Sequence, residues 1–97
     1  MVTFKESGGV LRCTFKGRMD TPACQEIEPQ VMAKINAATG YVVFDLMDVN
    51  YISSMFFRLC IQVRKEVDTG MFSIENAQPE VKNVFKIAGL SQMLNVQ

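Results

Sequence analysis

The chain has 97 residues, of which 48% are hydrophobic, so we expect one compact domain over residues 1–97 and no second domain. Basic and acidic residues number 10 each, so no net field attracts nucleic acid or an anionic membrane, and a protein partner suits this balance better. The apolar stretches are strand-sized and the N-terminal sequence has no basic segment followed by an apolar one, which predicts a cytoplasmic protein without membrane insertion.

The N-terminal residues predict a β-hairpin with one solvent-exposed face. Residues 2–6 alternate weakly in polarity, and Ser7-Gly8-Gly9 makes a turn before residues 10–16. In this second strand the apolar positions are Leu11, Cys13 and Phe15, and they alternate with polar ones.

A helix is predicted next. Thr21-Pro22 is a helix start, with the Thr21 hydroxyl free to cap, and the apolar stripe consists of Ile27, Val31 and Ile35. Pro29 interrupts this pattern. It either kinks the helix or marks its true start after a looser turn over residues 22–28.

The most informative run is a strand that leads into a pair of serines. Residues 41–46 are almost continuously apolar, as a strand covered on both faces of a parallel sheet would be. At the end of the loop 48–54, Ser53 and Ser54 stand where N-cap residues stand, because a serine oxygen can accept from free N–H groups of the first turn.

The helix that follows should run from Ser54 to about Val67. The residues predicted on its core face are Phe56, Leu59, Cys60, Val63 and Val67. Met55, Phe57 and Ile61 fall on the flanks of this face, and Arg58 falls on the solvent-exposed face.

The remaining residues predict a turn, a strand and a last helix. The turn is Asp68-Thr69-Gly70 and the strand covers residues 72–75. The helix begins at Gln78-Pro79-Glu80 and ends at Gly89 with Leu90 in a Schellman-type stop, and its apolar positions are Val81, Val84, Phe85 and Ala88. Residues 93–96 are at most a short edge strand.

This order of elements predicts an α/β fold. We expect a mixed, mostly parallel sheet of four to five strands with three main helices and right-handed crossovers. Sites in such sheets form beyond the carboxyl ends of the strands. The loops 17–21 and 48–54 should therefore converge there, with Asp20 and Ser54 as neighbours.

Side chains for metal binding or nucleophilic catalysis are few. The sequence has no histidine, and Cys13, Cys24 and Cys60 are widely separated. A tetrahedral metal site is hard to build from these residues, and a nucleophilic serine would lack the commonest general base. We expect three reduced thiols, no metal or other cofactor, no catalytic residue and no enzyme activity.

Four segments together resemble the STAS domain of bacterial anti-sigma factor antagonists. The main one contains Asp45-Leu46, Val49, Tyr51-Ile52, Ser53-Ser54 and Met55-Phe56-Phe57, and the others are Gly17-Arg18-Met19-Asp20, Pro79-Glu80-Val81 and Ile87-Ala88-Gly89-Leu90. Two departures from the family pattern matter for function. Ser53 stands where members often have aspartate, and Phe56-Phe57 stands where many have glycine and leucine.

The resemblance implies binding to an anti-sigma factor, usually a serine kinase that would use ATP and phosphorylate Ser54, so that a sigma factor is released to transcribe. The partner surface is predicted to contain Asp20, Asp48, Ser53, Ser54, Met55, Phe57 and Arg58, in part because Met, aromatic residues and Arg are enriched at interfaces. Phosphate at Ser54 would sit at a helix N-terminus, which favours an anion, and would disrupt a closely packed interface.

Two alternatives remain. A STAS scaffold that binds partners without phosphorylation is favoured by the two departures at Ser53 and Phe56. An accessory subunit of a lipid or small-ligand transport system has only the apolar flank of the second helix in its favour.

Overall fold

The computed structural model describes residues 1–68 and 70–97 and confirms the predicted α/β order. Its elements are β1 (Val2–Ser7), β2 (Val10–Met19), α1 (Thr21–Ala37), β3 (Tyr41–Ile52), α2 (Ser54–Glu66), β4 (Phe72–Glu75) and α3 (Pro79–Ile87). The four strands lie in the order β1-β2-β3-β4, with β1 antiparallel to β2 and the other pairs parallel. The predicted turn at residues 68–70 includes Thr69, which lies outside the described residues.

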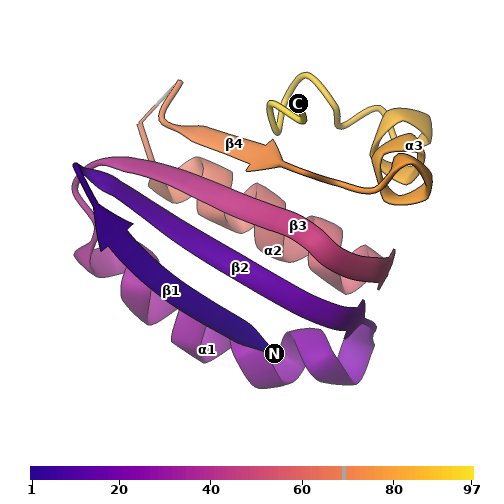
Figure 1. Ribbon diagram of the computed structural model, residues 1–97, viewed down its shortest axis with the longest axis horizontal. Coiled ribbons are helices and arrows are strands. Elements are labelled where there is room, and N and C mark those ends of the chain that lie inside the picture. The colour runs from indigo at the N-terminus through magenta and orange to yellow at the C-terminus, as the bar shows by residue number, and fades with distance from the viewer. Residues whose placement is uncertain (69) are drawn as a thin grey trace.

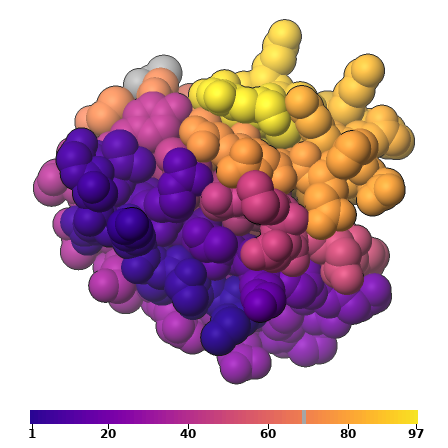
Figure 2. All heavy atoms as spheres, in the orientation of Figure 1, coloured from indigo at the N-terminus to yellow at the C-terminus, as the bar shows by residue number. Residues whose placement is uncertain are grey.

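Two helices cover one face of the sheet, and the third lies at its edge. Figure 1 shows α1 and α2 side by side behind the strands, with α3 and the C-terminal segment beyond β4. The opposite face of the sheet is open, so that β1 and β2 form part of the molecular surface in Figure 2. None of the described helices is long and apolar enough to cross a membrane.

The core lies between the sheet and α1 with α2. Alternate residues of β2 point into it, as the polarity pattern predicts, and Phe15, Phe44 and Phe56 are fully buried. The prediction that residues 41–46 are covered on both faces is wrong, because both helices pack on the same side of the sheet, and Tyr41 and Asp45 are half-buried on the other side. The Phe15 ring lies 4.7 Å from that of Phe44 and 5.2 Å from that of Phe56, both in edge-to-face geometry. Such aromatic pairs add about 0.5–1.5 kcal/mol each beyond their buried area.

The open face of the sheet carries an ion-pair network. Arg12 on β2 lies 3.0 Å from a carboxylate oxygen of Asp45 on β3 and 3.2 Å from one of Glu75 on β4. Asp45 also accepts a hydrogen bond from the backbone N–H of Met47. Arg12 therefore joins three strands on the face away from the helices.

Both central strands are longer than predicted. Pairing continues through Arg18 with Tyr51 and Met19 with Ile52, across register shifts near Lys16 and Gly17. Gly17 has a φ of 96°, which a residue without a side chain adopts at no steric cost. The bulged backbone breaks the alternation of polar and apolar residues, and this is why the sequence pattern indicates loops there.

The helix α1 is continuous across Pro29, so a start after that residue is wrong. Pro29 is exposed, and the carbonyl of Gln25 that loses its hydrogen-bond partner faces the same side, where water can solvate it. The N-cap is Asp20 instead of Thr21, because an Asp20 carboxylate oxygen accepts from the N–H of Ala23 at 3.1 Å.

The C-terminal part follows the prediction with one difference in burial. The Schellman stop is confirmed, since Leu90 N–H donates to the Phe85 carbonyl and Gly89 N–H to that of Lys86, both at 3.0 Å. Val84 and Ala88 are exposed instead of buried, because α3 lies at the sheet edge and only a narrow stripe of it is covered. Within residues 93–96, a single parallel bridge joins Val96 to Ile74.

The three cysteines are buried and free, in agreement with reduced thiols. Burial raises the pKa of the Cys13 thiol from 9.0 to about 12. The unfolded chain therefore loses this proton first, so the free energy of unfolding is unaffected below pH about 9 and falls as the pH rises from there toward about 12.

We expect the parent protein to lose roughly 1 kcal/mol more stability than Cys13→Ala between pH about 8 and about 10. Urea unfolding of both proteins at the two pH values checks this result. The two proteins differ at residue 13 alone, so an equal loss in both would contradict the assignment to Cys13.

Candidate functional site

The N-termini of α1 and α2 lie side by side at the carboxyl ends of β2 and β3. Met19 and Ile52 are paired at the last position of the two strands. The backbone N–H of Ser53 donates to the carbonyl of Met19 at 3.0 Å, so the residues that open each helix are tied together. This bond brings the Asp20 and Ser54 segments next to each other, as the sequence predicts.

Ser54 is the exposed first residue of α2, and Ser53 is the half-buried residue at its N-cap position. The carbonyl of Ser53 accepts from the N–H groups of Phe56 and Phe57 at 3.0 and 3.2 Å. The side chain of Ser53 makes no capping hydrogen bond. The prediction that a serine hydroxyl caps this helix is therefore wrong, and the N–H groups that open the helix lie next to the Ser54 side chain.

The Ser53 hydroxyl turns toward α1 instead of toward its own helix. Its oxygen lies 3.9 Å from the Cys24 sulfur, which also contacts the Met19 carbonyl at 3.6 Å. Burial raises the pKa of the Cys24 thiol, and the interaction with Ser53 offsets part of that rise. Cys24 is therefore a neutral thiol that joins the two helix N-termini.

The Asp20 side chain has two structural partners. It caps α1, and its second carboxylate oxygen lies 3.7 Å from Arg18. The guanidinium carbon of Arg18 in turn lies 4.1 Å above the centre of the Tyr51 ring, a cation–π geometry. Arg18 and Tyr51 are not among the predicted site residues, although both lie in the segments that resemble the STAS domain.

The other predicted residues of α2 lie around Ser54. Arg58 is exposed, lies one turn further along the helix and donates to the Met55 sulfur at 3.7 Å. Met55 and Phe57 are half-buried, and the Phe57 ring packs edge-to-face on Phe85 of α3 at 5.3 Å. Part of the Phe57 ring therefore packs inside the domain, and only the remainder is accessible to a partner.

Asp48 is not brought to this site. It lies within β3 instead of in a loop, and its backbone is paired with Lys16 of β2. Ile52 lies four positions further along the strand, at about 3.3 Å each, so the distance along the strand is roughly 13 Å. Residues 17–21 and 48–54 do lie side by side as predicted, but mostly as paired strands instead of loops, with Gly17 opposite Val49 and Met19 opposite Ile52.

Within residues 1–68 and 70–97, no three cysteine or carboxylate side chains lie together as metal ligands would. The site has an exposed Ser54 hydroxyl at a helix N-terminus, a neighbouring segment in which the Asp20 carboxylate caps α1, and Arg58 one helical turn from Ser54. This geometry suits contact with another protein and the binding of an anionic group.

The family model of the STAS domain matches residues 1–97. The chain belongs to the STAS domain family. Among similar proteins of this kind, BtrV of Bordetella bronchiseptica, named an anti-sigma factor antagonist, is 26% identical over 97 residues, covering 98% of this chain and 84% of BtrV.

Two solved structures share the STAS fold with this chain. The anti-sigma factor antagonist SpoIIAA in its unphosphorylated form superposes with a TM-score of 0.79 at 16% identity, covering all of this chain and 88% of the other. The Bacillus cell fate determinant SpoIIAA in the phosphorylated form superposes with a TM-score of 0.70 at 15% identity, covering all of this chain and 91% of the other. At these identities the likeness concerns the fold alone.

One departure of this STAS domain from the family pattern has a clear structural consequence. Phe56 replaces a common glycine, yet its side chain is fully buried against the sheet. The added bulk therefore fills the core and leaves the surface around Ser54 open. The other departure, Ser53, does affect the site, because it removes a negative charge beside Ser54.

Proposed function

We propose that this STAS domain is an anti-sigma factor antagonist. In this proposal it binds an anti-sigma factor that is also a serine kinase, through the surface formed by Asp20, Ser53, Ser54, Met55, Phe57 and Arg58. Phosphorylation of Ser54 from ATP ends this binding and so regulates sigma-factor-dependent transcription. Asp48 belongs to the surface only if the partner extends along β3.

The observation that carries the proposal is the exposure of Ser54 at the first position of α2, beside the N-terminus of α1. A kinase needs an accessible hydroxyl, and Ser54 supplies one, whereas Ser53 is half-buried with its oxygen near Cys24. The names of BtrV and SpoIIAA, which describe anti-sigma factor antagonists, support the same function.

Local electrostatics explain how a phosphate at Ser54 would act. It adds about −1.5 to −2 charges where free N–H groups and the helix dipole favour an anion. Arg58, at i+4 on the same face, can pair with it. The domain therefore keeps its fold, while a partner packed on this spot meets added bulk and a charge that the partner itself does not neutralise.

We expect incubation with the cognate kinase and ATP to add one phosphate, and phosphopeptide mapping to locate it at Ser54. The physical reason is the exposure difference between Ser54 and Ser53. Intact mass gives the number of phosphates, and Ser54→Ala serves as the control that should stay unmodified. Phosphate found on Ser53 alone would overturn the assignment.

The second candidate function is a STAS scaffold that binds its partner without being phosphorylated. It is favoured by Ser53, because the aspartate common at this position is missing. In that case the intact mass stays unchanged in the kinase reaction, although the partner still co-purifies with the chain.

A further inference from the structure

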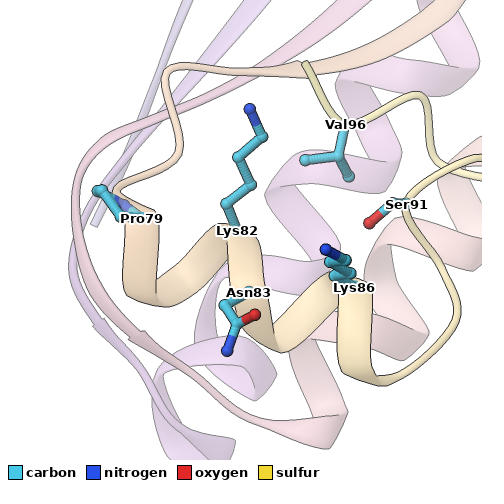
Figure 3. A pocket seen from close by; sticks show the side chains of 6 residues that line it. All are labelled: Pro79, Lys82, Asn83, Lys86, Ser91 and Val96. Carbon is cyan, nitrogen blue, oxygen red and sulfur yellow. The ribbon is translucent and has the colours of Figure 1, made fainter.

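A hollow of 490 Å³ lies between α3 and the segment that follows it, away from the Ser54 site. Its lining residues are Pro79, Lys82, Asn83, Lys86, Ser91 and Val96. Figure 3 shows the helix on one side of this hollow, with Ser91 and Val96 facing it from the returning chain. The volume falls within the range of about 300–1,000 Å³ that is typical of small-molecule sites.

The hollow has a mostly apolar surface, and its polar side chains are basic or hydrogen-bonding. Lys82 and Lys86 are four residues apart on α3, so their ammonium groups share one side of the helix. The lining contains no carboxylate. In the part of the chain that the structure describes, the side-chain ion pairs involve Arg12 and Arg18 and neither of these lysines.

The walls of the hollow are held in place by the fold. The Schellman bonds at Gly89 and Leu90 fix the exit of α3. Leu94 is fully buried, its N–H donates to the Leu90 carbonyl at 3.0 Å, and Val96 bridges to Ile74 of β4. The returning segment is therefore anchored at both ends, and the hollow is formed before any ligand binds.

We propose that this hollow binds the phosphate group of a small organic phosphate. Lys82 and Lys86 supply two positive charges for a dianionic phosphate, for which lysine is a common ligand as a point charge. The Ser91 hydroxyl and the Asn83 amide add neutral donors. Pro79 and Val96 give an apolar wall for the carbon part of the ligand. The inference does not depend on the function proposed for Ser54.

The phosphate can come from a soluble metabolite or from a phospholipid headgroup, and two probes distinguish these sources. The soluble probe is glycerol 3-phosphate, and glycerol is its neutral control. NMR titrations measure the binding of each compound from the shifts of backbone amide signals. The membrane probe is sedimentation with phosphatidylglycerol vesicles, with phosphatidylcholine vesicles as the control.

We expect saturable shifts confined to α3 and residues 90–96 with glycerol 3-phosphate and none with glycerol. Lys82→Gln/Lys86→Gln should weaken this binding by about tenfold or more, whereas the control Lys16→Gln/Lys65→Gln, with the same change in charge, should leave it within about twofold. All four lysines are exposed, so urea midpoints close to the parent should verify folding.

Vesicle binding that depends on Lys82 and Lys86, without binding of the soluble probe, would support the same phosphate site with a lipid source. Two results would overturn the proposal. One is the absence of saturable binding to either probe. The other is an equal loss of binding in both double variants, which would mean that net charge alone attracts the phosphate.

Discussion

Truncation of Phe56 to alanine is expected to lower the free energy of unfolding by about 3–5 kcal/mol, the largest effect of any change considered for this chain. The side chain is fully buried, and its ring contacts that of Phe15 at 5.2 Å and lies 6.4 Å from that of Phe44. Alanine would leave a cavity between α2 and the sheet, where the closely packed strands cannot collapse to fill it.

The neighbouring Phe57→Ala provides the matched control, because Phe57 has the same side chain but is half-buried against Phe85. Urea unfolding of the parent and both variants should show a clearly larger loss for Phe56. A midpoint for Phe56→Ala equal to that of the parent would mean that this side chain is not part of the core.

The second expected result is a loss of partner affinity of tenfold or more in Ser54→Asp, while Ser54→Ala binds like the parent. Tenfold corresponds to about 1.4 kcal/mol, which a charge left unpaired in a desolvated interface readily exceeds. Both variants should fold with stability within about 0.5 kcal/mol of the parent, because Ser54 is exposed and its hydroxyl is not at the cap position.

Calorimetric titration of each form against the anti-sigma partner measures this difference. Ser7→Asp is a suitable control, because it adds the same charge at an exposed residue at the opposite end of the sheet. Its affinity should equal that of the parent. If Ser54→Asp is folded and binds as tightly as Ser7→Asp, Ser54 lies outside the interface and the proposed switch is wrong.

The class of fold and the position of Ser54 in it follow from local sequence patterns. Alternation in β2 and the helical spacing in α2 are local patterns, and burial of Phe15 and Phe56 follows from them. A serine pair directly after an apolar strand likewise marks the start of a helix from local preference alone. The Schellman stop at Gly89 is local in the same way, since it depends on one residue that adopts positive φ.

Which residues near these elements act together depends on contacts between segments that are distant in the sequence. The extensions of β2 and β3 depend on hydrogen bonds between strands, which no pattern within one strand reveals. The same pairing places Arg18 on Tyr51, and Asp48 stays within the strand, remote from Ser54. The Ser53 hydroxyl turns to Cys24, because the two helix N-termini are packed against each other.

The hollow beside α3 shows the same division. Lys82 and Lys86 can be assigned to one side of a helix from their spacing, but the sequence pattern does not reveal what faces them. Ser91 and Val96 reach them because the chain turns back after Gly89 and pairs with β4 at Ile74. Local periodicity thus determines which side of an element a residue occupies, whereas contacts between distant segments determine what that residue meets.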